Sequence, residues 1–315
     1  MAQTLVSAAS RFVSTLLFGT CSKELIRVHS WPFILWLASI ALFWAPLHQL
    51  VSLSLDDRRY SHLILIPVIS AFFLYRERHR IFSRIVFRPR AALPYLAAFL
   101  ALYALLALRV VHPSTDYALT LVMLAIVLVW LAGFAVCYGV HAFRAAVFPL
   151  LFLLLLVPVP FDAMDWTVSV LQRGSAEVTY RFFSLAGVPM FRDGVRFELP
   201  GIGIEVAEEC SSIHSAWALF ITGLLVAHMF LKSIWTKAGL SVLTVPIAML
   251  TNAVRIVTIW FLGTHVDVGF LYGNLHRNGG ILFSLISLSI LMSFLYILRK
   301  LERHGHPAGI AAAAA

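Results

Sequence analysis

Charged residues are scarce in this sequence, and their scarcity excludes a water-soluble domain of ordinary composition. Asp, Glu, Lys and Arg make up 12% of the 315 residues, whereas a soluble domain carries roughly 25%. Apolar residues make up 61%, and the mean hydropathy is +0.89. They occur in long blocks, as expected of helices that need about 20 residues to cross the hydrocarbon of a bilayer. The sequence therefore predicts a polytopic membrane protein.

Several familiar patterns are also missing from the sequence. It has no internal repeat, no nucleotide-binding glycine loop and no zinc-type Cys/His spacing, so no cofactor or metal is predicted. Pro and Gly lie at the ends of apolar blocks and never form a long linker. Residues 31–300 are therefore predicted to form a single integral membrane domain. We expect residues 1–30 to be a cytoplasmic N-terminal segment and residues 301–315 to be a disordered cytoplasmic tail.

Eight apolar blocks are predicted to cross the membrane, and the second is short for a span. They run near 31–53, 61–75, 91–111, 117–138, 145–161, 211–231, 238–262 and 279–298. The expected fold class is an all-α polytopic membrane protein of about eight transmembrane helices.

The distribution of basic residues predicts the orientation of these spans. With eight spans both termini share one side, and fifteen of the 24 Lys and Arg residues fall on it. They lie in the N-terminal segment, the 76–90 loop, the 139–144 and 232–237 turns, and the C-terminal segment. The positive-inside rule assigns this side to the cytoplasm. The net charge of +9 is thus explained by topology, and no nucleic-acid partner is expected.

One long extracytoplasmic segment, 158–210, separates the fifth and sixth spans. Residues 165–187 predict an amphipathic helix in the interface plane, because Arg173, Glu177 and Arg181 recur at i, i+4 and i+8. Its predicted apolar cover consists of Trp166, Val170, Val178, Phe182 and Leu185. Residues 194–209 then alternate apolar and polar side chains around Pro200-Gly201, which predicts a small β-hairpin.

Cys210 follows this hairpin and has no expected disulfide partner. The topology places Cys21 and Cys137 toward the cytoplasm and Cys210 on the outer face, where disulfides form. It also stands at the predicted N-terminus of the sixth span, where the helix dipole favours a thiolate. A reactive thiol and a small residue in helix packing remain equally good interpretations of this position alone.

Arg255 and His276 are predicted to lie toward the same leaflet as Cys210. Arg255 is inside the seventh span, about two turns from its outer end, and an arginine at the centre of a helix costs ~2.5–3.5 kcal/mol to insert. It is therefore expected to face a polar pocket, with snorkelling to the headgroups as the alternative. Asn252, three residues earlier, lies on the same face and is expected to orient the guanidinium. His276 precedes the eighth span, and alone it is a weak signal.

Four stretches of the chain resemble the signatures of the exosortase/archaeosortase family of multi-pass membrane proteases and transpeptidases. Three of them are EVAEECSSIHS, TNAVRIV and LHRNGG, in that order, and the fourth is the earlier DRRYSHLILIPVISAFFLYRER. The resemblance spans roughly residues 50–298. The chain departs from the family at Ser212, where glycine is usual, and at Gly279-Gly280, near which relatives often have an aromatic residue.

The resemblance implies a catalytic set of Cys210, Arg255 and His276, with Asn252, Tyr60 and His62 in substrate binding. Cys210 would attack a peptide carbonyl in a C-terminal sorting signal and form a thioester, which water or an amine resolves. Such a signal has a short Pro-Glu-Pro-like motif, a spanning helix and a basic tail. The expected partners are exported proteins with this signal, membrane lipids and exopolysaccharide export components. The expected site is the extracytoplasmic face of the inner membrane.

Two other functions remain open at this stage. A transporter or lipid-handling protein would use Arg255 and His276 to bind an anion, and it would show inverted repeats. A non-catalytic partner in an exopolysaccharide export system would not need the Cys210 thiol. If the catalytic interpretation holds, the functional atoms of Cys210, Arg255 and His276 lie within about 4–8 Å of one another.

Overall fold

The structure is a computed structural model, and it describes residues 33–34, 36–85, 97, 101, 104–105, 116–199, 202–206, 213–272 and 280–304. The chain forms two compact units. Unit 1 comprises Met1–Leu53 and Leu63–Pro158, and unit 2 comprises Ser54–His62 and Val159–Ala315. The short segment 54–62 therefore packs with the C-terminal half of the chain. The expectation of one membrane domain over 31–300 stays a prediction.

Unit 1 is built from helices that bury apolar faces against one another. Its elements are α3 (Trp44–Asp56, whose last residues belong to unit 2), α4 (Leu65–Arg76), α5 (Arg78–Ile81), α7 (Asp116–Ala145), α8 (Val147–Phe152) and the 3₁₀ helix η3 (Leu153–Leu156). Two hydrogen bonds that involve serine hydroxyl groups link segments of this unit. Ser70 Oγ donates to the Pro149 carbonyl at 2.7 Å, and Trp130 Nε1 donates to Ser39 Oγ at 2.9 Å. Gly139 interrupts α7 with a φ of 84°, directly after the predicted end of the fourth span at 138.

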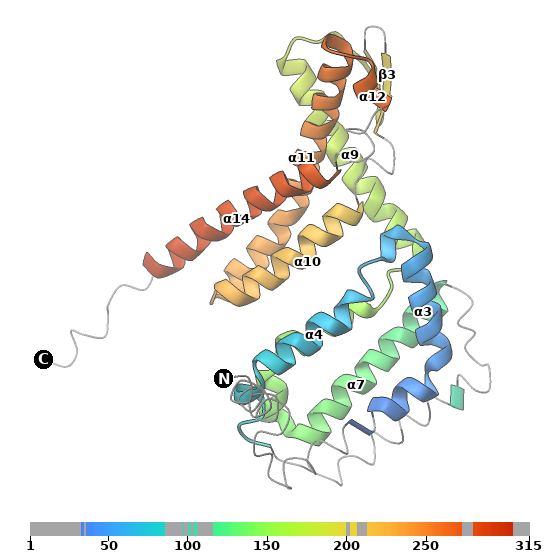
Figure 1. Cartoon of the computed structure of the whole chain (residues 1–315), viewed down its shortest axis with the longest axis vertical. Coiled ribbons are helices and arrows are strands. Elements are labelled where there is room, and N and C mark those ends of the chain that lie inside the picture. The colour runs from blue at the N-terminus through green and yellow to red at the C-terminus, as the bar shows by residue number, and fades with distance from the viewer. Residues whose placement is uncertain are drawn as a thin grey trace, which may run out of the picture. The chain divides into compact units, whose positions relative to one another are not determined.

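Unit 2 contains a three-helix bundle. Its helices are α10 (Ile213–Phe230), α11 (Ile234–His265) and α14 (Gly280–His304), and each contacts the other two. Figure 1 shows them side by side. A shared apolar core holds them together, formed by Leu219, Ala227, Leu231, Leu240, Ile247, Leu291 and Leu295. The remaining elements of unit 2 are the 3₁₀ helix η1 (Arg58–Tyr60), α9 (Phe161–Leu185), three strands and α12 (Gly269–Tyr272).

The predicted hairpin is present and belongs to a three-stranded antiparallel sheet. Strands β2 (Arg196–Leu199) and β3 (Ile202–Glu205) pair as expected, with Leu199 opposite Ile202 around the predicted turn. A further strand, β1 (Phe191–Asp193), pairs with β2. Gly194 joins β1 and β2 with a φ of 60°, a value that favours glycine.

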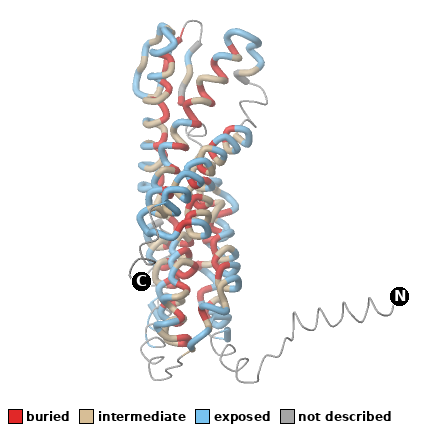
Figure 2. Tube along the Cα trace, turned by 90° about the vertical axis from the view of Figure 1, so that its left-hand side faces the viewer, coloured by how far each residue is buried: buried red, intermediate tan, exposed pale blue. Residues whose placement is uncertain are grey.

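The amphipathic helix is also present as α9, and it packs on the protein mainly through residues other than the predicted apolar cover. The buried residues of α9 are Met164, Val168, Leu171, Ser175, Ala176, Thr179 and Phe183, and α9 contacts α11. Trp166, Val170 and Leu185, from the predicted apolar cover, are exposed. The burial-coloured trace shows buried and exposed positions alternating along the helices, as one-sided packing requires (Figure 2). The interfacial location of α9 stays a prediction.

Four described helices are long and apolar enough to cross a membrane: the α7 segment Tyr117–Ala145, α10, α11 and α14. The count rises to six if two sharply bent pairs of helices are each taken as one broken span. Most of the predicted third span, 91–111, lies outside the described residues. The second predicted span corresponds to the 12-residue α4. The structure therefore confirms an all-α membrane protein with a small sheet, and it does not confirm eight spans.

Candidate functional site

Arg255 lies on α11 where the helix leaves the three-helix bundle. α11 has 32 residues and continues to His265, three residues beyond the predicted end of the seventh span. Arg255 comes 21 residues after the start of α11, or about 31 Å at 1.5 Å per residue. This distance matches the roughly 30 Å thickness of a bilayer's hydrocarbon. The arginine is therefore at the far end of a membrane-length piece of helix, not at its middle.

Beyond Arg255, α11 packs against the elements that precede the bundle in sequence. Ile256 and Trp260 of α11 share a buried apolar cluster with Phe183 of α9 and Phe197 of β2. Phe183 lies edge-to-face with Trp260, with ring centroids 4.9 Å apart. The amphipathic helix and the sheet thus hold this end of α11 in place, and through it they position the Arg255 backbone.

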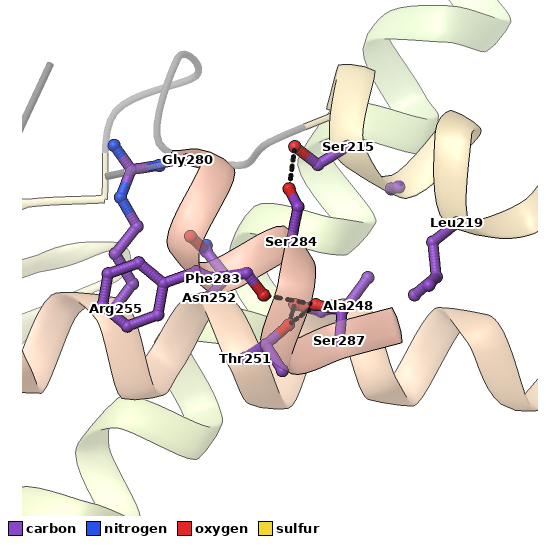
Figure 3. Close-up of a pocket in the computed structure, with 11 residues that line it drawn as sticks. Ser215, Leu219, Ala248, Thr251, Asn252, Arg255, Gly280, Phe283, Ser284 and Ser287 are labelled. Carbon is purple, nitrogen blue, oxygen red and sulfur yellow. Dashed lines mark hydrogen bonds between the residues drawn. The ribbon is translucent and has the colours of Figure 1, made fainter. Parts of the chain in front are cut away.

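A small polar cavity lies where α10, α11 and α14 meet (Figure 3). Its volume is about 20 Å³. Its polar lining comes from all three helices and consists of Ser215, Thr251, Asn252, Arg255, Ser284 and Ser287. Arg255 is 8% exposed and Asn252 is 4% exposed. The cavity gives Arg255 the polar surroundings that its position in an apolar helix requires.

Paired hydroxyl groups fix α14 to its two neighbours at this cavity. Ser284 Oγ donates to Ser215 Oγ of α10 at 3.2 Å, and Ser287 Oγ lies 2.8 Å from Thr251 Oγ1 of α11. Thr251 Oγ1 in turn donates to the Ile247 carbonyl at 2.8 Å. The pairs thus link all three helices through polar groups at the cavity.

The sequence neighbours of the predicted nucleophile and base border this cavity together with Arg255. Cys210 and His276 themselves lie outside the described residues. α10 begins at Ile213, three residues after Cys210, and Ser215 in its first turn lines the cavity. α14 begins at Gly280, four residues after His276, and Gly280 is also a lining residue. Three of the four motif stretches therefore lead to one place. The predicted separation of 4–8 Å stays a prediction.

The fourth motif stretch docks on the same end of α10. His62 stacks on Trp217, with ring centroids 4.7 Å apart and an interplanar angle of 17°. Ser61 Oγ lies 2.9 Å from Nδ1 of His214, the second residue of α10. Tyr60 is buried, and its hydroxyl donates to the Val159 carbonyl at 2.7 Å. Tyr60 and His62 are thus brought to the Cys210 end of α10, where their role in substrate binding stays a prediction.

An ion pair fastens this stretch to the start of α9. Arg59 contacts both Asp57 and Asp165 at 2.8 Å, and its guanidinium lies over the Phe161 ring. Asp57 also accepts from the Arg59 backbone N–H at 2.9 Å and so caps η1. Burial raises the pKa of Asp57, but the hydrogen bonds and charge of Arg59 outweigh it and leave that pKa below its usual value.

Several residues around this site were not predicted from the sequence. The main examples are His214, Trp217, Ser215 and Ser284. The sequence feature that could have identified them is a polar or aromatic side chain within an otherwise apolar helix. Within the described ranges, no group of three His, Cys, Asp or Glu side chains is placed to hold a metal ion.

The family comparison agrees with the positions of these motifs. A family model described as Transmembrane exosortase matches residues 54–293, more than half of the 315-residue chain. The match starts at the segment that docks on α10 and ends within α14. No curated protein and no solved structure matches the chain.

Proposed function

This chain belongs to the transmembrane exosortase family, and from that premise we propose that it is a membrane-embedded cysteine peptidase or transpeptidase. Its substrates are exported proteins with a C-terminal sorting signal made of a short motif, a spanning helix and a basic tail. Cleavage takes place at the extracytoplasmic face of the inner membrane, with both termini of the enzyme in the cytoplasm. The asymmetric distribution of Lys and Arg supports this orientation.

The observation that carries the proposal is the meeting of three helix segments at the Arg255 cavity. The cavity is lined by Ser215, five residues after Cys210, by Arg255, and by Gly280, four residues after His276. A nucleophile, a proton carrier and an oxyanion donor need this kind of convergence. A protein in which these motifs served only separate packing contacts would not require it.

Each of the three residues has a chemical role in the proposed reaction. Cys210 passes its thiol proton to His276 and attacks the scissile carbonyl through Sγ. Arg255 stabilises the negative charge that develops on the carbonyl oxygen. The C–N bond then breaks, His276 returns the proton to the leaving amine, and a thioester remains on Cys210. Water or an acceptor amine attacks this thioester and regenerates the thiol.

Arg192 is a second candidate cation for contact with an acidic residue in the sorting motif. Arg192 is engaged within the protein, because its guanidinium contacts Glu177 at 2.8 Å and lies over the rings of Tyr180 and Phe197. This engagement favours Arg255 over Arg192 as the cation that contacts the motif.

The test is removal of the basic tail from a co-expressed substrate. A candidate is a protein encoded near this gene that ends in a short motif, an apolar 20-mer and a basic tail. Intact-mass measurement should show tail loss with the wild-type enzyme and none with Cys210→Ser, because a hydroxyl is a poorer nucleophile. Cys137→Ser is the matched control, since Cys137 is a buried thiol in α7 of unit 1, and it should process normally. Normal processing by Cys210→Ser would favour the non-catalytic assembly partner.

A further inference from the structure

Asn252 presents an unusual combination of burial and missing contacts. Its side chain lines the Arg255 cavity and is 4% exposed. Among the residues that the structure describes, neither Oδ1 nor Nδ2 has a hydrogen-bond partner. A buried carboxamide without partners is unfavourable, because it has lost its contacts with water and gained none in exchange. Figure 3 shows the group on the side of α11 that faces α14.

The chemistry of a carboxamide restricts what can satisfy it. Oδ1 only accepts hydrogen bonds and Nδ2 only donates them. A cation would satisfy the oxygen alone, and the neighbouring Arg255 would repel it. An anion would satisfy the nitrogen alone. A single ligand that satisfies both atoms must both donate and accept, as a neutral hydroxyl group or a water molecule does.

The size of the cavity then selects among neutral ligands. A cavity needs about 10–15 Å³ to hold one water molecule, and this one has about 20 Å³. This volume matches one water molecule. We propose that the cavity is a binding site for one ordered water molecule, held by Asn252 next to Arg255.

The other walls of the cavity supply the remaining partners that an internal water needs. Ser215, Ser284 and Ser287 line it, and a hydroxyl oxygen that already takes part in one hydrogen bond still has accepting capacity. Internal waters make two to four hydrogen bonds. The site therefore differs from an apolar cavity of the same size, which would stay dry.

This water gives Asn252 a role distinct from contact with the substrate. Asn252 is then a positioning residue, because it holds the water molecule next to Arg255. The inference concerns the resting protein, so it does not depend on the proposed peptidase reaction.

X-ray hydroxyl-radical footprinting with mass spectrometry tests this proposal. Radicals formed from a bound water oxidise the side chains beside it, even when bulk solvent does not reach them. Phe283 and Leu219 line the cavity and are 7% and 6% exposed. Phe152 and Leu295 lie outside this cavity and are similarly buried, at 4% and 7%. We expect Phe283 to be oxidised at least several-fold faster than Phe152, and Leu219 faster than Leu295.

Variants of Asn252 separate a bound water from leakage of bulk solvent. Asn252→Leu fills the space and removes the polar anchor, so Phe283 oxidation should fall to the Phe152 rate. Asn252→Met is the second variant if the leucine protein does not accumulate, because its flexible apolar side chain also fills the space, and the same fall is expected. Thr222→Val is the control, because Thr222 bonds within its own helix at 2.7 Å and does not line the cavity.

Two results would overturn the proposal. Wild-type Phe283 as slow as Phe152 would mean a dry cavity, and fast oxidation that persists in both Asn252 variants would mean access from bulk solvent. Tail removal from a substrate is measured separately with Cys210→Ser, so failure of one proposal does not count against the other.

Discussion

The contact between Gly223 and Thr244 sets how closely α10 approaches α11. A Cβ atom added to Gly223 would lie 2.7 Å from Cγ2 of Thr244, whereas ordinary contacts begin at 3.4 Å. Thr244 is buried, and its hydroxyl donates to the Ser241 carbonyl at 2.6 Å. Its branched side chain has few alternative rotamers in a helix. Gly223→Ala should therefore force the two helices apart by a few tenths of an ångström or more.

The expected magnitude follows from two opposing effects. Alanine improves helix propensity over glycine by about 0.8–1.0 kcal/mol. Overpacking a tight contact costs about 1–3 kcal/mol. Gly223→Ala should thus destabilise the protein by roughly 1 kcal/mol.

Gly174→Ala is the matched control for this substitution. A Cβ atom there would lie 2.5 Å from Sδ of Met249, which is nominally a closer approach. The methionine end is flexible and can move aside. Gly174→Ala should therefore be neutral, or stabilising by up to about 1 kcal/mol.

Reversible unfolding in mixed detergent micelles measures both free energies. Thr244→Ser removes Cγ2 and keeps the hydroxyl. In the Thr244→Ser protein, Gly223→Ala should therefore no longer lower the unfolding free energy as it does in the wild type. Processing should follow stability, because α10 follows the Cys210 stretch and α11 carries Arg255. If Gly223→Ala is as stable as wild type, or if the double variant shows no recovery, the tight contact does not control the α10–α11 separation.

Four further substitutions or treatments have defined outcomes. Arg255→Lys should lower the processing rate by roughly 100-fold, because lysine lacks the planar fork of donors; a fully active variant would reduce Arg255 to a charge. A membrane-impermeant maleimide should label Cys210 in intact cells but not the buried Cys137, and labelling only after lysis would invert the topology. Glu302→Gln should lower the unfolding free energy by about 1 kcal/mol, since its carboxylate accepts from two backbone N–H groups at the start of α11. Asp57→Asn should lower the unfolding free energy by the same amount throughout pH 5–8. The difference from wild type should shrink below about pH 4, because the Asp57 carboxylate of the wild type becomes protonated as its lowered pKa is crossed. A free-energy difference that is independent of pH down to pH 2 would contradict the ion pair.

The sheet and the amphipathic helix show how far the sequence alone could go. The alternation of apolar and polar residues over 194–209 predicted the β2–β3 hairpin, and Phe197 and Leu199 of β2 are buried as this pattern requires. β1 has only three residues, and its pairing with β2 depends on the fold that brings them together. The helical periodicity of α9 was predicted from the sequence, but the residues through which it packs on the rest of the protein were not. Ser175 and Thr179 are buried there, and small hydroxyl residues give little signal in a hydrophobic pattern although they allow close helix packing.

In the candidate site, too, features set by neighbouring residues were predictable, whereas contacts between distant segments were not. Arg255 was predicted from a cost that any apolar helix imposes on a charge. Ser215 and Ser284, which line the same cavity, lie 40 residues before and 29 residues after Arg255 in sequence. No local pattern specifies that such hydroxyls face one cavity. The eight-span count fails to be confirmed for a related reason: α4 has only 12 residues, and the membrane position of so short a helix is set by its neighbours.

The length of α11 connects the fold to the proposed substrate. Its 32 residues measure about 48 Å, which exceeds the roughly 30 Å of hydrocarbon. The first part packs in the bundle through Leu240 and Ile247, and the last part packs under α9 and the sheet through Trp260. Arg255 lies between them, so protein rather than lipid surrounds the charge. A substrate helix held in the cytoplasm by its basic tail would reach the same level after about 20 residues. The enzyme and the sorting signal would thus use one bilayer thickness to bring the scissile motif to the arginine.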